Sequence, residues 1–187
     1  PFGAGTVEIP DAGGQPRAVR VIMARVATQS GDLVVASAHL KCCGTIGWSE
    51  DEVRMAEALA INAAFAAALA AAPAPYRVIG GDLNLVGSRP PLDLLRTSLD
   101  ADGTDLGVAE AFVLGDRAQY TWSSPGDTFP PGRLDYLMYS DSSAEVVNAF
   151  VLDTTRLSDA ALARIGLDRD DTLASDHLPL VVDLRAR

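Results

Sequence analysis

Arg77-Val-Ile-Gly-Gly-Asp-Leu-Asn84 is the stretch of the sequence that carries most information about the fold. Its apolar first half predicts a short buried strand over residues 77–83 that ends in polar residues. In an extended segment, residues two apart project from the same side, so we expect Asp82 and Asn84 to point together beyond the strand. The two glycines would let another backbone or a ligand approach closely. The alternative is a strand that ends in an Asx-type turn, for which these residue types are typical.

The sequence on either side of this stretch predicts strands and unevenly placed helices. Two β-branched runs, Arg17 to Val26 and Asp32 to Leu40, are joined by Gln29-Ser-Gly-Asp32 and predict an antiparallel hairpin. Ser49-Glu-Asp-Glu52 has the spacing of a capping box, and apolar residues follow it at helical intervals to about Ala72. The remaining predictions are a helix over 91–99, strands over 119–123, 133–140 and 146–154, a helix over 158–167, an acidic loop over 168–171 and a strand over 178–184. This order favours mixed, largely antiparallel sheets covered by helices over a regular βαβ alternation.

Composition restricts the class of protein. The chain has 187 residues, of which 48% are hydrophobic, so it can bury a core and is not a disordered chain. Its net charge of −10 disfavours tight nonspecific binding of nucleic acid, although bound cations can still allow phosphate chemistry. The apolar run Ala56 to Ala72 is short and carries Glu57 and Asn62, so no stable membrane span is predicted. The adjacent Cys42 and Cys43 are either two reduced thiols or a strained vicinal disulfide.

A second polar motif, Ser175-Asp-His-Leu-Pro179, follows an acidic loop and precedes the last predicted strand. Asp176 offers an oxygen ligand for a metal ion and His177 a titratable imidazole, provided that the backbone turns at this point. Pro179 holds the residue before it extended and so marks the beginning of the strand. The alternative is a solvated turn without a chemical role.

Two further motifs offer partners for this imidazole. Asp135 lies between apolar residues at the head of the predicted strand over 133–140, where it either orients an imidazole such as His177 or forms an ion pair with Arg133 at the strand edge. His39 ends a strongly apolar strand and is either a core histidine or a site residue. The chain has only 2 histidines, and both lie at strand ends beside small or polar residues. Together with several carboxylates they could divide general acid and general base work.

In their order and spacing, these four segments resemble the endonuclease/exonuclease/phosphatase superfamily. These are metal-dependent phosphoesterases that include DNase I, abasic-site endonucleases, neutral sphingomyelinases and inositol polyphosphate phosphatases. The resemblance covers roughly Val19 to Leu184, and Gly81-Asp-Leu-Asn84 followed by Ser175-Asp-His177 is its most specific part. It implies a DNase I-like, four-layered α/β (α+β) sandwich, in which two packed sheets are flanked by helices and the site lies at one end of the sheets.

The resemblance also implies a role for each motif residue. Asp82 would align or deprotonate the attacking water, and Asn84 would steady Asp82 and the phosphate. His177 would contact the scissile phosphate, with Asp135 as its orienting partner. His39 would stabilise the phosphate or serve the leaving group.

The same resemblance implies a divalent cation, usually Mg²⁺ and sometimes Mn²⁺. Asp176 would approach this ion, and Asp82, Asn84 and His177 are the other expected ligands. An inventory of oxygen donors without a thiolate cage agrees with such an ion.

One departure from the family concerns its first half. Members begin with a strand that ends in Asn, followed by a strand and helix that supply a metal-anchoring Glu, and neither segment is found here. Glu8 lies in a Gly- and Pro-rich stretch, and the next glutamates belong to the helix after the His39 motif. We therefore expect residues 1–187 to form a single partial domain, the C-terminal half of the fold. Its partner would be a missing N-terminal segment of the same fold, without which apolar sheet faces would lie uncovered.

The functional prediction is a metal-dependent hydrolase of phosphate esters that acts by in-line attack of water. Its substrate would be a nucleic acid, a phospholipid headgroup or an inositol phosphate, among which the sequence does not choose. The alternative is a non-catalytic remnant or interaction module that retains part of the sandwich.

Overall fold

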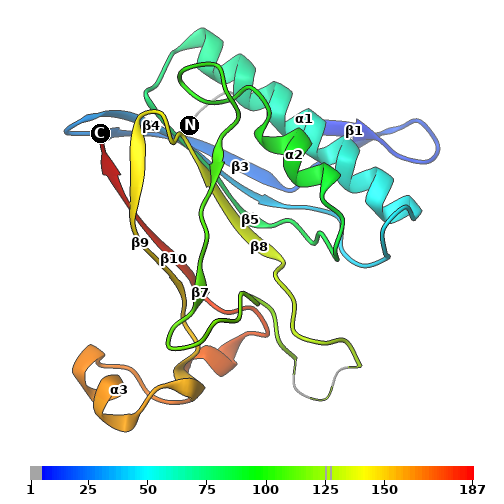
Figure 1. Ribbon diagram of the computed structural model, residues 1–187. Coiled ribbons are helices and arrows are strands. Elements are labelled where there is room, and N and C mark those ends of the chain that lie inside the picture. Colours follow the sequence, from blue (N-terminus) through cyan, green and yellow to red (C-terminus); the bar gives the residue numbers. More distant parts are fainter. Residues whose placement is uncertain (1–5, 125, 127) are drawn as a thin grey trace.

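A five-stranded mixed sheet is the central element of the computed structural model, which describes residues 6–124, 126 and 128–187 (Figure 1). Its strand order is β3-β4-β5-β8-β6, in which β4 and β5 are parallel and the other pairs are antiparallel. The strands are β3 (Val21–Thr28), β4 (Gly31–His39), β5 (Tyr76–Asp82), β8 (Asp135–Tyr139) and β6 (Gly107–Val108). The predicted hairpin and the strand over 77–83 correspond to β3, β4 and β5.

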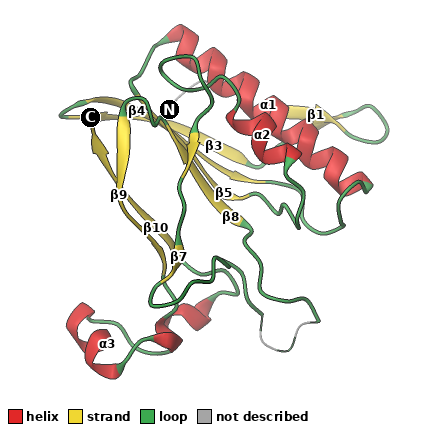
Figure 2. Ribbon diagram, in the orientation of Figure 1, coloured by secondary structure: helices red, strands yellow, loops and turns green. Residues whose placement is uncertain are grey.

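Helices α1 (Ser49–Ala71) and α2 (Pro90–Arg96) lie side by side over one face of this sheet (Figure 2). Alternate residues of β4 point toward the helices, so Val34 and Ala36 are buried together with Ile61 and Phe65 of α1. Among the described residues, α1 is the one helix that is long and apolar enough by composition to cross a membrane. Its apolar residues nevertheless form the core between helix and sheet, and its buried Arg54 and Glu57 make ion pairs.

A smaller sheet lies on the other side of the five-stranded sheet and has the order β10-β9-β7. Its strands are β9 (Ala144–Val151), β10 (Leu180–Ala186) and β7 (Phe112–Val113). Residues at the end of β10 and residues of β4 and β5 line a cavity of about 270 Å³ between the two sheets. The remaining elements are a hairpin of β1 (Glu8–Pro10) and β2 (Pro16–Ala18), helix α3 (Asp159–Ile165) and two 3₁₀ helices, Thr154–Arg156 and Asp171–Ala174. The predicted fold class, a mixed α/β protein with two sheets and flanking helices, is confirmed.

Four local predictions need correction. The segment 119–123 is not a strand, because only Trp122 pairs, through isolated bridges to Gly132 and His177. The predicted strand over 17–26 is divided into two. Residues 16–18 form β2, which pairs with β1, and residues 21–28 form β3, which pairs with β4. The capping box does not form: Ser49 makes no cap, and Asp51 instead accepts a hydrogen bond from the Gly47 amide. The acidic loop over 168–171 leads into a 3₁₀ helix.

The glycine pair before Asp82 does allow a close backbone approach, as predicted. Gly81 has a φ of +133°, and a Cβ atom at this position would lie 2.0 Å from the carbonyl oxygen of Ala38 on β4. We expect Gly81→Ala to lower the free energy of unfolding by about 3 kcal/mol, because backbone strain adds to a clash with another backbone. Gly132→Ala is the control, since its Cβ would meet no atom within 4 Å. Equal midpoints for both variants in urea unfolding would contradict this account.

Candidate active site

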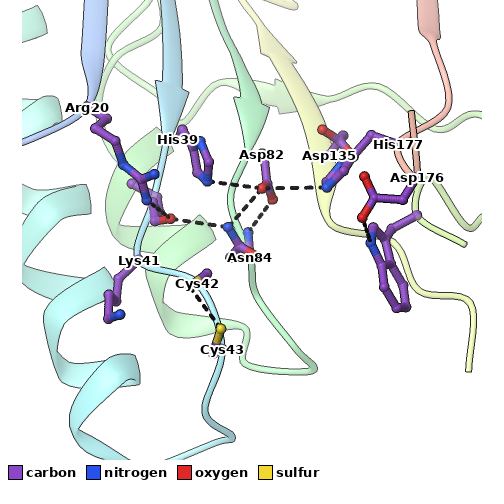
Figure 3. Close-up of polar contacts among 12 residues, drawn as sticks. Arg20, His39, Lys41, Cys42, Cys43, Asp82, Asn84, Asp135, Asp176 and His177 are labelled. Carbon is purple, nitrogen blue, oxygen red and sulfur yellow. Dashed lines mark hydrogen bonds and ion pairs between the residues drawn. The ribbon is translucent and has the colours of Figure 1, made fainter. Parts of the chain in front are cut away.

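Three of the expected site residues form one row across the ends of adjacent strands. His39 ends β4, Asp82 ends β5 and Asp135 begins β8, and the sheet register pairs His39 with Asp82 and Asp82 with Asp135. Residues paired in register project from the same face, so the three side chains lie together (Figure 3). His39 Nε2 lies 3.4 Å from Asp82 Oδ2, and His177 Nε2 lies 3.9 Å from the same oxygen. Asp82 is thus flanked by both imidazoles of the chain.

Asn84 reaches Asp82 through a turn. Its φ of +47° bends the chain, its backbone N–H donates to Asp82 Oδ1 at 2.9 Å, and its side-chain Nδ2 donates to Asp82 Oδ2 at 2.8 Å. The first contact is that of an Asx turn. Nδ2 also donates to the carbonyl oxygen of Leu40 at 3.2 Å. The turn and the site interpretation of this motif therefore describe the same geometry, because the turn is what brings the Asn84 amide onto the Asp82 carboxylate.

His177 is held by Asp135 and by the segment over 119–123, for which the sequence predicted a strand. Its Nδ1 lies 2.7 Å from Asp135 Oδ2, which leaves Nε2 directed toward Asp82. Trp122 pairs with the His177 backbone, and the hydroxyl of the buried Thr121 accepts hydrogen bonds from the amides of Leu134 and Asp135. One short segment thus fixes the backbone on both sides of the His177 and Asp135 pair.

Arg133 and Asp176 lie differently from their expected places. Arg133 makes no ion pair with Asp135 among the described contacts, because it pairs with Glu110 at 3.3 Å and lies 4.5 Å from the ring centroid of Tyr136. Asp176 points away from the row, and its Oδ2 accepts a hydrogen bond from the indole N–H of Trp122 at 2.9 Å (Figure 3). The structure does not bring Asp176 to the other acidic residues.

The surroundings of the site shift the pKa of Asp82, in the row, and of His177, beside it. Burial raises the pKa of Asp82, and the negative charge of Asp135 adds to this rise, whereas the Asn84 amide and the two imidazoles oppose it. Burial alone would lower the pKa of His177, but its hydrogen bond to Asp135 and the nearby carboxylates outweigh burial and raise it. A carboxylate with raised basicity beside an imidazole that favours its protonated form is suited to moving protons to and from a bound ester.

Asp82, Asp135 and His177 are also the described residues that could share a metal ion, since one ligand atom from each lies within 4.8 Å of the others. Two carboxylates paired across neighbouring strands repel each other, and a cation would relieve this repulsion. Carboxylate and amide oxygens without thiolates are a donor set that suits Mg²⁺ or Mn²⁺. Cys42 and Cys43 are free thiols, and Cys43 Sγ donates to Cys42 Sγ at 2.9 Å.

The sequence reasoning missed two residues near the row. Thr121 carries no motif, and its role depends on β8 lying beside it. Arg20 precedes β3 and donates from Nη2 to the carbonyl oxygen of Leu40 at 3.2 Å, next to His39. The sequence offered only a weak signal for Arg20, because a single cation within a predicted strand is common and does not by itself indicate a site.

The model of the Endonuclease/Exonuclease/phosphatase family matches residues 6–177 of this sequence. The chain belongs to this family. Comparison with curated protein sequences gives no match. The family resemblance that the four sequence motifs indicated is therefore confirmed over most of the chain.

Several solved structures share the fold of this chain. An endonuclease/exonuclease/phosphatase protein from Beutenbergia cavernae is 23% identical with a TM-score of 0.52, and the match covers 100% of this chain and 45% of that one. D. rerio TDP2, solved with a single-strand DNA product, is 17% identical with a TM-score of 0.53, and 88% and 61% of the chains are covered. A Staphylococcus aureus beta toxin variant with bound magnesium ions is 13% identical with a TM-score of 0.51, covering 72% and 47%. The chain spans about half the length of these solved structures.

Proposed function

We propose that the protein containing this chain hydrolyses a phosphate ester with the help of a divalent cation. The observation that supports this most is the row in which Asp82 lies between His39 and His177, with Asp135 bound to the far nitrogen of His177. Membership of the Endonuclease/Exonuclease/phosphatase family gives independent support.

In the proposed reaction a water attacks phosphorus in line with the leaving oxygen. Asp82 holds this water and accepts its proton as the new P–O bond forms. His177 donates a hydrogen bond from Nε2 to a non-bridging oxygen, where negative charge develops. The leaving oxygen departs with its bonding electrons and takes a proton from His39, whose side chain is 47% exposed. Asp135 keeps the His177 ring oriented and stabilises its charged form.

The cation is proposed to be Mg²⁺ or Mn²⁺. Asp82 and Asp135 would hold this ion, and the side-chain oxygen of Asn84, in the same turn as Asp82, would be a further ligand. The sequence also led us to expect His177 and Asp176 as ligands. Such an ion would neutralise charge on the phosphate oxygens. The bound magnesium in the beta toxin structure, which shares the fold, supports this choice.

The test uses the full-length protein and bis(p-nitrophenyl) phosphate as a generic phosphodiester. We expect hydrolysis with Mg²⁺, loss of hydrolysis with a chelator, and recovery when Mg²⁺ or Mn²⁺ is added back. Asp82→Asn should lower kcat about 100-fold, because an amide can hold the water but cannot accept its proton. Asp183→Ala, which removes an exposed carboxylate of β10, is the control and should leave kcat unchanged.

Two results would count against the proposal. One is an unchanged rate in Asp82→Asn, and the other is hydrolysis that survives complete removal of divalent ions. A protein that is folded but inert with every metal tested would support the non-catalytic alternative.

A further inference from the structure

Cys42 and Cys43 lie on the segment that follows His39 and have no part in the proposed reaction. Both are free thiols, and the Sγ atom of Cys43 lies 2.9 Å from that of Cys42 (Figure 3). Cys43 is exposed and Cys42 is partly buried, so a small reagent can reach the pair. They are the 2 cysteines of the sequence, and each thiol therefore has the other as its possible disulfide partner within this chain.

A turn of the backbone brings the two sulfur atoms together. Side chains of neighbouring residues in an extended segment point in opposite directions. Cys43 instead has a φ of +71°, and Gly44 after it also has a φ of +71°. A residue other than glycine rarely adopts this conformation. The turn thus places both thiols on the same side of the chain.

The peptide group between the two cysteines is unpaired. Among the described residues, neither the Cys42 carbonyl nor the Cys43 amide makes a hydrogen bond. The carbonyls on either side, those of Lys41 and Cys43, both accept from Nη1 of Arg54, at 3.1 and 2.8 Å. A disulfide between adjacent residues would close a small ring around the unpaired peptide, so the peptide inside the ring would lose no hydrogen bond.

Closure of this ring would act on the contacts of Arg54. The ring restricts ψ of Cys42 and φ of Cys43, and these two angles also set how the flanking carbonyls point relative to each other. Both carbonyls converge on one nitrogen of a fully buried guanidinium. A ring that changes these angles therefore weakens at least one of the two hydrogen bonds.

The segment that Arg54 holds leads directly to the catalytic row. The Leu40 amide donates to the carbonyl oxygen of Asp82 at 2.9 Å, and the Leu40 carbonyl accepts from Nδ2 of Asn84 at 3.2 Å. The same Nδ2 donates to the Asp82 carboxylate at 2.8 Å (Figure 3). A displacement of Lys41 and Leu40 would thus reach the carboxylate through Asn84.

We propose that Cys42 and Cys43 form a redox-sensitive modification site, at which a small-molecule disulfide oxidises both thiols to a vicinal disulfide and loosens the segment next to the row. The thiolate of one cysteine attacks the reagent, an S–S bond to the protein forms, and the reagent's own S–S bond breaks. The released thiolate takes up the proton that the cysteine lost. The second cysteine then attacks the protein sulfur, the ring closes, and a second thiol leaves. The protein thiols lose two electrons and two protons in total, and the reagent gains them.

This disulfide should open again readily. The Cα atoms of adjacent residues are about 3.8 Å apart, below the usual range of about 4.4–6.8 Å for disulfides. Strain of this kind makes a disulfide easier to reduce, whereas structural disulfides resist reduction by glutathione. We therefore expect a reversible modification rather than a permanent crosslink.

The test follows the pair by mass in the full-length protein. The protein is incubated with oxidised glutathione and digested with trypsin, and the peptide Cys42–Arg54 is analysed without reduction. The hydrogen bond to Cys42 raises the pKa of Cys43, so exchange is slow at neutral pH and incubation continues to equilibrium. We expect the peptide to lose two hydrogens and to carry no glutathione, and excess reduced glutathione should restore its mass.

Single variants are the matched controls. Cys42→Ser and Cys43→Ser lack the second thiol, so each should retain one glutathione on the remaining cysteine. Phenylarsine oxide, which needs two neighbouring thiols, should bind the reduced wild type and neither single variant. Wild type that retains glutathione, or that stays unmodified, would overturn the proposal. A ring that persists in excess reduced glutathione would also overturn it, because the disulfide would then be structural.

The connection to the row has its own test, which needs no turnover. The Leu40 amide is bonded to Asp82 and the Lys41 amide to Glu57, at 2.9 and 2.7 Å, and hydrogen exchange at both amides should be faster after oxidation. Unchanged exchange would overturn this part of the proposal, whether or not the protein hydrolyses an ester.

If the proposed function holds, oxidation should also lower kcat for bis(p-nitrophenyl) phosphate about fivefold, the effect of one weakened hydrogen bond. The double variant Cys42→Ser/Cys43→Ser should show the same kcat before and after treatment. Equal kcat in reduced and oxidised wild type would contradict the connection between the pair and the row. Absence of hydrolysis in both forms would count against the proposed function, and the mass and exchange results would still decide the modification site.

Discussion

Replacement of His177 by alanine is expected to lower kcat for phosphodiester hydrolysis about 1,000-fold, with a smaller change in KM. His177 is only partly exposed, its Nδ1 is bound to Asp135 at 2.7 Å, and Nε2 is directed toward Asp82. A prepositioned donor near developing charge contributes about 100- to 1,000-fold to kcat. The measurement is steady-state hydrolysis of bis(p-nitrophenyl) phosphate by the full-length protein.

Asp135→Asn distinguishes orientation of His177 from mere packing. An amide at this position removes the negative charge that favours the protonated ring, and its N–H can donate to Nδ1 and so hold the ring in a neutral form. At saturating Mg²⁺, which compensates for a weaker metal contact at this position, we expect kcat to fall at least tenfold and the affinity for a non-hydrolysed phosphate analogue to change little. His39→Ala should cost less than His177→Ala, because the exposed His39 has no comparable carboxylate partner at its far nitrogen among the described residues. A loss below tenfold in a folded His177→Ala protein would reject the assigned role.

The second large effect concerns stability, since Arg54→Met should lower the free energy of unfolding by about 4 kcal/mol. Arg54 is fully buried, pairs with Asp51 at 3.1 Å and donates to the carbonyl oxygens of Lys41 and Cys43 at 3.1 and 2.8 Å. Methionine would fill much of the space but would leave the carboxylate and both carbonyls without this partner. Urea unfolding measures the change, and Arg164→Met, at an exposed position, should change stability by about 0.5 kcal/mol or less.

The stability effect of Arg54 should also depend on pH. Burial by itself would raise the pKa of Asp51, but hydrogen bonds from the Gly47 amide and Ser88 and the pairing with Arg54 outweigh burial and lower it. A carboxyl with a lowered folded-state pKa stabilises the fold above its unfolded pKa, and this stabilisation is lost as the pH falls through the folded value. The difference in stability between wild type and Arg54→Met should therefore narrow in acid. A difference that stays constant from neutral to acidic pH would contradict this explanation.

Arg54 also connects stability to the site. It holds the segment after His39 through two carbonyls, and the buried Glu57 holds the same segment by accepting from the Lys41 amide at 2.7 Å. Asp51 accepts from Ser88, which follows the Asp82 turn, at 2.9 Å. The polar side of α1 thus fixes both chain segments that follow His39 and Asp82.

Local patterns were sufficient to predict most elements and each residue of the row. Alternating and helical periodicities depend only on near neighbours in sequence, so β4, β5, β8 and α1 were predicted close to their observed bounds. The same reasoning failed for 119–123, where a β-like composition occurs in a segment that pairs only at Trp122. Propensity cannot show that a neighbouring strand is absent.

The sequence by itself determined which chemical groups stand at the strand ends, because Asp82, Asn84 and His177 lie in short motifs that can be recognised without a partner. Only the tertiary structure decided how these groups meet. Asp135 and His177 are 42 residues apart, and their contact depends on the pairing of β5 with β8 and on the bridge at Trp122. The place of Arg20, which immediately precedes β3, depends likewise on the pairing of β3 with β4, because its carbonyl oxygen accepts a hydrogen bond from the His39 amide. Register and long-range pairing arise from burial of a whole sheet face, which no local pattern encodes.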